Sequence, residues 1–203
     1  MSKITDILPS LDKKGRYDIY ADGEQVLTLS EDAIVECSLK VGDILDTNRL
    51  CEIEEKLELV RTRAKAYNLL SYGDMSKKTL FTKLSRSGYG EDAINKCICI
   101  LEEQGYLDDE RYANRLCAYL ASTKLFGKRR ILLELIQKGI DRQLAELVTE
   151  EQDADYYQNL LTLISKERIT DEKSITRLKN KLVRYGYDYD MISSALGSGE
   201  YYD

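Results

Sequence analysis

The densest group of side chains that could bind a charged partner is basic. Lys128, Arg129 and Arg130 are consecutive and follow Gly127, at the predicted start of a helix. Cations at the N-terminal end of a helix oppose the helix macrodipole, so they gain no local stability from that position. Their placement suggests a use outside the helix, such as binding a phosphate group or an acidic protein surface. The alternative is a charged face that contacts only water.

Other basic residues complete the set of candidates. Arg111 and Arg115 lie one turn apart on a single predicted helix, where they could face a partner or pair with nearby acids. Outside the first cluster, the candidate binding residues are Lys77, Lys78, Arg86, Arg111 and Arg115.

Catalytic side chains and metal ligands are poorly represented. The chain has no histidine, which removes Ser-His-Asp and Cys-His nucleophiles and most catalytic zinc sites. Its five cysteines include no C-x-x-C spacing, and Cys97 and Cys99 point in different directions on a predicted helix. We expect reduced, structural thiols. Pairs of carboxylates arise by chance among 36 Asp and Glu. The sequence therefore predicts no enzyme activity, no metal and no cofactor.

Composition predicts a soluble cytoplasmic protein. Apolar residues make up 43% of the chain, and no apolar run approaches the roughly 20 residues of a membrane span. The first ten residues lack a signal-peptide pattern. Residues 1–48 carry five Lys and Arg against ten Asp and Glu, and residues 151–203 carry seven against ten. The middle of the chain is nearly neutral, which argues against a strongly basic DNA-binding protein of the usual kind.

The N-terminal segment has the pattern of a β-hairpin. Strands are predicted at Arg16–Tyr20 and Gln25–Leu29, joined by Asp22-Gly23, two residues that tolerate the positive φ of a tight turn. Ser30 is expected to cap a short helix that ends near Leu39, and a further extended piece follows at residues 42–45. An isolated hairpin is marginal, so this unit should pack on the helix or on the main body.

From Thr47 onward the apolar period is helical. One predicted apolar stripe consists of Ile53, Leu57, Val60, Ala64 and Tyr67, and others follow along the chain. Glycines are expected to mark the helix ends because glycine adopts the left-handed cap conformation cheaply. They are Gly73, Gly88, Gly105, Gly127, Gly139 and Gly186.

Three of these glycines reveal an internal repeat. Gly88, Gly139 and Gly186 lie 51 and then 47 residues apart. Apolar residues recur eight and four positions before each glycine and six after it: Leu80, Leu84 and Ile94; Ile131, Leu135 and Ala145; Leu178, Leu182 and Ile192. Lys77 and Lys78 occupy in the first repeat the place of the basic cluster in the second, and Arg177 is what remains of it in the third.

Each repeat is predicted to contain three helices, and neighbouring repeats should stack into a curved, elongated array. The predicted fold is mostly α, with a small N-terminal β-hairpin unit at residues 1–48 and three-helix repeats at residues 49–106, 107–151 and 152–203. The alternative is one irregular helical bundle in which the glycine spacing is accidental.

Two segments resemble the RecX family. Residues 105–113, Gly-Tyr-Leu-Asp-Asp-Glu-Arg-Tyr-Ala, are similar to the family's strongest segment. Residues 127–131, followed by Glu134-Leu135 and Lys138-Gly139-Ile140, are similar to its second signature. The N-terminal hairpin resembles an extension found in one branch of the family. The resemblance covers about residues 15 to 197 and is weaker in the third repeat.

The resemblance implies a monomeric regulator that lies in the groove of a RecA filament on single-stranded DNA. It would slow ATP turnover, strand exchange and coprotease activity there, and any direct contact with DNA would be weak. Gly73-Asp74-Met75 precede Ser76, where the family usually offers arginines, so a basic contact is missing. The alternatives are a nucleic-acid-binding module that acts without RecA, and a structural adaptor for another helical assembly.

Overall fold

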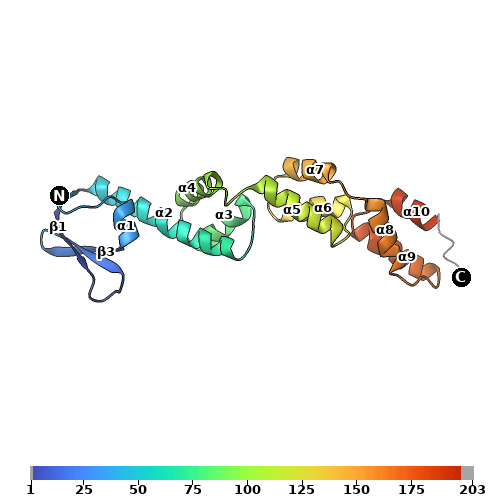
Figure 1. Cartoon of the computed structure of the whole chain (residues 1–203), viewed down its shortest axis with the longest axis horizontal. Coiled ribbons are helices and arrows are strands. Elements are labelled where there is room, and N and C mark those ends of the chain that lie inside the picture. Colours follow the sequence, from blue (N-terminus) through green and yellow to red (C-terminus); the bar gives the residue numbers. More distant parts are fainter. Residues whose placement is uncertain (1, 198–203) are drawn as a thin grey trace. The chain divides into compact units, whose positions relative to one another are not determined.

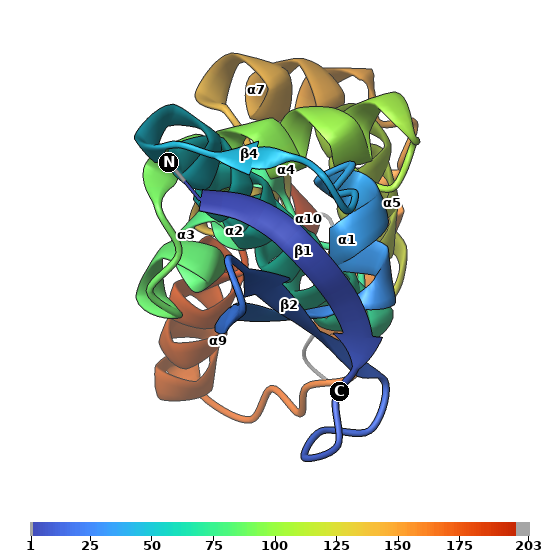
Figure 2. The same cartoon turned by 90° about the vertical axis from the view of Figure 1, so that its left-hand side faces the viewer.

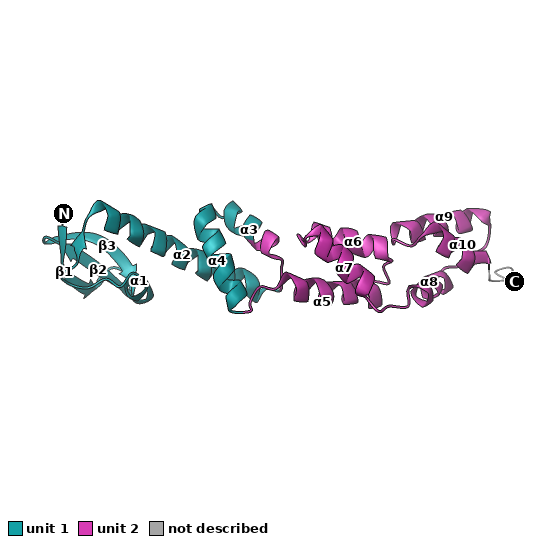
Figure 3. Cartoon of the chain, turned by 90° about the horizontal axis from the view of Figure 1, so that it is seen from above, with its two compact units in different colours: residues 1–73, 81–104 teal, residues 74–80, 105–203 magenta. Residues whose placement is uncertain are grey.

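The computed structural model describes residues 2–197, which form four strands and ten helices (Figure 1). The chain divides into two compact units (Figure 3). The first contains residues 1–73 and 81–104, and the second contains residues 74–80 and 105–203.

The N-terminal strands form one antiparallel sheet of four, in the order β3-β2-β1-β4. The strands are β1 (Ser2–Pro9), β2 (Arg16–Ala21), β3 (Glu24–Ser30) and β4 (Ile44–Leu45). The predicted hairpin is confirmed as β2–β3, and both Asp22 and Gly23 have positive φ, at 50° and 89°. Figure 2 shows β1 between β4 and β2. The sequence prediction missed β1 because a register shift between Ile4 and Asp6 interrupts its alternation of apolar and polar residues.

The sheet closes over a small apolar core together with two helices. Helix α1 (Glu31–Glu36) begins at Ser30, whose hydroxyl accepts the Ala33 N–H at 3.4 Å as predicted, and it ends before the expected Leu39. The core combines strand, α1 and α2 side chains: Ile4, Ile19, Ala21, Leu29, Ala33, Cys37, Leu39, Leu45, Ile53 and Leu57.

Helix α2 (Thr47–Ser71) begins at Asp46, which accepts the Arg49 N–H at 2.7 Å. Its buried residues are Ile53, Leu57, Thr62 and Ala66. The second half of the predicted stripe is therefore wrong as a core face, since Val60 and Tyr67 are only half-buried and Ala64 is exposed. The buried face rotates because the first half of α2 packs in the sheet's core and a later part packs on α4 (Glu91–Glu103).

The remaining helices group in threes around the repeat glycines. The first module is α2, α3 (Lys77–Arg86) and α4; the second is α5 (Asp109–Ser122), α6 (Lys128–Gln137) and α7 (Arg142–Glu151); the third is α8 (Tyr156–Ser165), α9 (Glu172–Arg184) and α10 (Tyr189–Gly197). All nine apolar positions of the repeat are buried, and none is more than 4% exposed. The second and third modules share one apolar core. The repeat is confirmed; the four domain boundaries stay a prediction.

The glycines do not all act as the sequence suggested. Gly88, Gly139 and Gly186 have φ of 87°, 86° and 92°, as expected for residues that end a helix. Gly127 instead has φ of −78° and precedes the first turn of α6. The prediction that Gly127 ends a helix in the left-handed conformation is therefore wrong. Glycine is needed there because a Cβ would meet the backbone of Gly186.

Burial of the thiols, which their predicted structural role implies, holds for Cys37, Cys97 and Cys117 but not for the exposed Cys51 and Cys99. All five cysteines are unpaired; Cys97 is buried and Cys99 is exposed, two residues apart on α4. Burial raises the pKa of the Cys97 and Cys117 thiols to about 11, so both are protonated and unreactive at neutral pH. Among residues 2–197, no group of three or more His, Cys, Asp or Glu could hold a metal ion. No helix in that range is long and apolar enough to cross a membrane.

Leu135→Ala should lower the free energy of unfolding by about 2–5 kcal/mol, because the fully buried Leu135 would leave a cavity in the core of the second unit. Leu133→Ala is the matched control, since Leu133 lies on the same helix and is 54% exposed. Urea denaturation of both variants provides the measurement. Equal midpoints for the two variants would contradict the repeat alignment.

Candidate functional site

Two similar contacts inside the second unit lie beside some of the predicted basic residues, namely Lys77, Lys78 and the Lys128–Arg130 cluster. In each, the turn that holds a repeat glycine packs against the first residues of a helix from the preceding module. We call these the first and second turn contacts.

The first turn contact joins the Lys138-Gly139 turn to the start of α3. The Lys138 carbonyl accepts hydrogen bonds from the hydroxyls of Ser76 at 2.6 Å and Thr79 at 2.9 Å. The approach leaves no room for a side chain, because a Cβ added to Gly139 would lie 2.5 Å from Ser76 Oγ. The Lys77 N–H is also bonded, to the Asp109 carboxylate at 2.9 Å.

The second turn contact joins the Tyr185-Gly186 turn to the start of α6. The Gly127 N–H donates to the Tyr185 carbonyl at 2.8 Å. A Cβ added to Gly127 would lie 2.4 Å from the Gly186 oxygen, and one added to Gly186 would lie 2.3 Å from the Arg130 nitrogen. The close approach of two backbones therefore explains why both positions are glycine.

The hydroxyl of Tyr187 holds the same region from inside. It donates to the carbonyl of Leu125 at 2.9 Å, in the loop before α6. Burial raises the pKa of Tyr187 far above its usual value, which keeps the hydroxyl protonated as a donor. The loop is further ordered by Phe126, whose ring meets that of Tyr185 edge to face at 5.3 Å.

Each member of the Lys128–Arg130 cluster has a partner within the chain. Arg129 pairs with Asp188 of the third module at 2.8 Å, and Arg130 pairs with Glu134 at 2.5 Å. The Lys128 ammonium lies over the Tyr156 ring, 5.7 Å from its centroid. These three contacts partly offset the electrostatic cost of placing cations at the start of a helix. Arg129 nevertheless stays 76% exposed, so a partner can reach it.

The other predicted residues separate into two groups. Arg115 forms an ion pair with Asp74, and Arg111 donates to the Gly105 carbonyl at 2.8 Å, so both stabilise the entry to the second module. Asp74 is therefore used within the chain. Lys77 and Lys78 begin α3 beside the first turn contact. Arg86 ends α3 in the first unit, and its side chain is exposed.

The third module carries a basic surface that was not among the binding residues predicted from the sequence. We call it the third-module basic face: Arg168, Arg177, Lys181 and Arg184. The missed signal was the spacing of four and three residues along α9, which places three of these cations on one side of the helix. Lys181 donates to Glu167 at 2.5 Å, and this hydrogen bond raises the pKa of Lys181.

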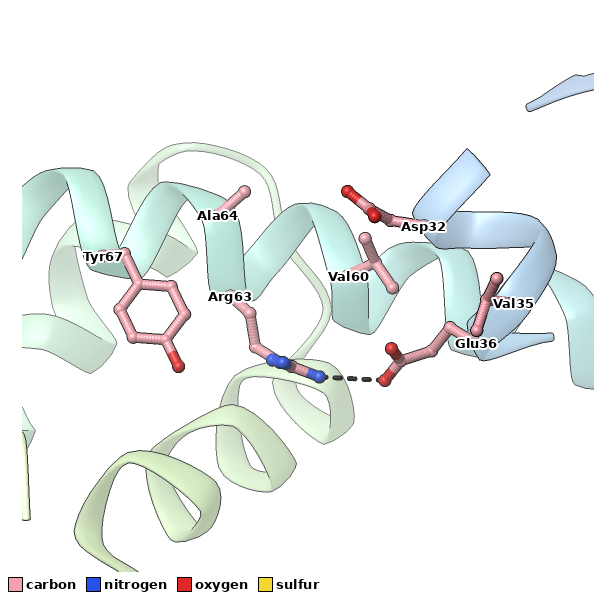
Figure 4. A pocket seen from close by; sticks show the side chains of 7 residues that line it. All are labelled: Asp32, Val35, Glu36, Val60, Arg63, Ala64 and Tyr67. Carbon is pink, nitrogen blue, oxygen red and sulfur yellow. Dashed lines mark hydrogen bonds and ion pairs between the residues drawn. The ribbon is translucent and has the colours of Figure 1, made fainter. Parts of the chain in front are cut away.

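A hollow lies in the first unit, between α1 and α2 (Figure 4). Its volume is about 410 Å³, and Val35, Val60 and Ala64 form its apolar part. The Arg63–Glu36 ion pair, at 2.9 Å, crosses it. The Tyr67 hydroxyl donates to Gln104 at 2.7 Å. The Arg63 Nε is buried and has no hydrogen-bond partner among the described residues.

Comparison with known proteins identifies both helical modules that carry the basic residues. Residues 63–99 match the family model "RecX, first three-helix domain", and residues 108–148 match "RecX, second three-helix domain". Regulatory protein RecX of Clostridium botulinum is 27% identical over the whole of both chains. Regulatory protein RecX of Clostridioides difficile is 29% identical and covers 97% of this chain and 95% of that one.

Two crystal structures share the fold. One of regulatory protein RecX has a TM-score of 0.78 at 21% identity and covers 98% of this chain and all of that chain. One of RecX from Lactobacillus salivarius has a TM-score of 0.62 at 25% identity and covers 69% of this chain and 95% of that one. The three-helix modules and the N-terminal strand unit are therefore an established architecture.

Gly186→Ala should destabilise the protein much more than Gly88→Ala. Both glycines have φ near 90°, so both variants lose about 1–2 kcal/mol through backbone strain. Only the Gly186 methyl would meet backbone atoms, and the resulting shift should cost a further 1–3 kcal/mol or so. Thermal unfolding measures both, and equal losses would show that the second turn contact does not form.

Proposed function

Because the chain belongs to the RecX family, we propose that it regulates the RecA recombinase in the cytoplasm. It binds, as a monomer, the filament that RecA forms on single-stranded DNA. There it lowers the ATPase, strand-exchange and coprotease activities of RecA and so modulates recombination and DNA repair.

The observation that carries this proposal is the pair of matches to RecX domain models, together with similarity to regulatory RecX proteins along the whole chain. Both matched segments include predicted binding residues, Lys77, Lys78 and Arg86 in the first and Arg111, Arg115 and Lys128–Arg130 in the second.

The geometry supplies a physical basis for filament binding. The turn contacts place basic residues beside the start of α3 and again beside the start of α6. Equivalent subunits of a filament repeat in space, so a chain with repeated contact groups can engage more than one of them. Each contact raises the effective concentration of the next, and several weak contacts then give firm binding.

The second candidate is a helical-repeat module that binds nucleic acid without RecA. The exposed guanidinium of Arg129 favours it, because arginine recognises phosphate groups. The net charge of −6 disfavours it, since the chain as a whole repels DNA. Binding to bare single-stranded DNA and to the assembled filament discriminates between the two.

We expect this protein to lower the single-stranded-DNA-dependent ATPase rate of its host's RecA at substoichiometric ratios. The Lys128→Ala/Arg129→Ala/Arg130→Ala variant should inhibit less, because it lacks the second module's cationic contacts. An unchanged ATPase rate at several-fold molar excess of the parent protein would contradict the proposal.

Asp188→Ala is the matched control for that variant. It breaks the same Arg129–Asp188 pair but keeps all three cations, and an exposed pair of this kind contributes at most about 1 kcal/mol. We expect Asp188→Ala to inhibit RecA as the parent does. If the triple variant also inhibits like the parent, the cluster is a solvated face.

A further inference from the structure

The hollow between α1 and α2, which we call the α1–α2 hollow, gathers apolar side chains that the rest of the described chain leaves uncovered. They are Val35 of α1 and Val60 and Ala64 of α2 (Figure 4). Val35 is 72% exposed. Single exposed valines are common on protein surfaces, but here three apolar residues line one hollow of about 410 Å³, which is the size of a binding pocket.

The α2 side of the hollow is a straight row of apolar groups. Val60, Ala64 and Tyr67 follow at spacings of four and three residues, so they lie on one side of the helix and span about 10 Å, or two turns. A second helix presents apolar side chains with the same rise, whereas a strand alternates its side chains and rises about 3.3 Å per residue. The hollow therefore fits apolar side chains from about two turns of an amphipathic helix.

Carboxylates border the apolar groups on the α1 side. Helix α1 contains Glu31, Asp32 and Glu36 and no basic residue. Glu36 is its last residue, where the helix macrodipole disfavours a negative charge. Asp32, which also lines the hollow, has no ion-pair partner among residues 2–197. Because residues 1–48 carry ten Asp and Glu against five Lys and Arg, a partner at this hollow should be cationic.

The cation now beside Glu36 is the chain's own Arg63. Its side chain crosses the hollow and pairs with Glu36 at 2.9 Å (Figure 4). The pair is incomplete, because the Arg63 Nε is buried without a hydrogen-bond partner among the described residues. An unsatisfied buried donor destabilises this arrangement, and it is relieved when Arg63 turns out into water.

We propose that the α1–α2 hollow binds a basic amphipathic helix of a partner protein. The apolar side chains of that helix pack on Val35, Val60 and Ala64. Its lysine or arginine side chains pair with Asp32 and, by displacing Arg63, with Glu36. This contact goes beyond the proposed regulation of RecA, and it uses none of the basic residues proposed to act there.

Fluorescence anisotropy with a short helical peptide that repeats Leu-Ala-Arg-Leu-Ala-Lys-Ala tests the proposal. The salt concentration is about 0.15 M, where screening over about 8 Å limits the effect of distant charges. Asp32→Asn/Glu36→Gln should weaken binding roughly tenfold, because each lost ion pair contributes up to about fivefold. Arg63→Ala should instead tighten binding a few-fold, because it removes the cation that competes for Glu36.

Matched controls separate the hollow from the general charge of the first unit. Asp12→Asn/Glu54→Gln removes two exposed carboxylates outside the hollow, and Arg61→Ala removes an exposed cation from α2; both should bind the peptide as the parent does. Val35→Ser should weaken binding several-fold, whereas Val41→Ser, at a residue 61% exposed and outside the hollow, should not. Thermal midpoints close to that of the parent show that each variant is folded.

The proposal is overturned if the parent does not bind the peptide at about 1 mM, or if it binds as tightly a version with glutamate in place of arginine and lysine. It is also overturned if the hollow variants and their controls bind alike, or if Arg63→Ala weakens binding. Self-association of the parent that Asp32→Asn/Glu36→Gln abolishes would assign the hollow to a second copy of the chain instead. Because RecA is absent from the assay, a protein that inhibits RecA without binding the peptide refutes this proposal alone.

Discussion

The structure of the second unit depends on two turns whose backbones lie directly against the start of a preceding helix. The carbonyl groups of Lys138 and Tyr185 accept the hydrogen bonds, and glycine at the next position leaves space for the approach. Because the contacts are made by backbone groups, a side chain at Gly139 or Gly186 would block them. Both positions therefore require glycine. The apolar core stabilises the modules, and these contacts fix which faces meet.

The turn contacts also lie beside the polar groups at the starts of two helices. At the start of α3, the Lys77 N–H is bonded to the Asp109 carboxylate and the Thr79 N–H to the Ser76 hydroxyl. Before α6, the Gly127 N–H is bonded to the Tyr185 carbonyl. Lys128 and Arg129 remain exposed beside the second turn contact. Helix α9 differs, since Asp171 and Ser174 cap it from within its own sequence. Arg177 and Arg184 of this helix are exposed.

The repeat could be predicted from sequence because it rests on local rules. Glycine at a helix end and leucine at fixed distances from it need no knowledge of tertiary structure, and the nine predicted positions are buried. Strand β1 was missed because of a bulge. Helix α2 was predicted, but the second half of its apolar stripe was wrong because its buried face changes along its length. The role of Gly127 depends on Gly186, and the partner of Arg129 is Asp188; both lie 59 residues away along the chain (186 − 127 and 188 − 129). The basic side of α9 was visible in the spacing of Arg177, Lys181 and Arg184, but its exposure and aromatic neighbours were not.

Hydrogen exchange at the Gly127 amide tests the turn contact most directly. As the residue that caps α6, Gly127 has no acceptor within its helix, and among residues 2–197 its N–H is bonded to the Tyr185 carbonyl alone, at 2.8 Å. The account predicts that this amide exchanges orders of magnitude more slowly than in an unstructured peptide, at a rate near that of the core amide of Leu135. Exchange at the unstructured rate would show that the turn does not hold the helix, and would contradict the account.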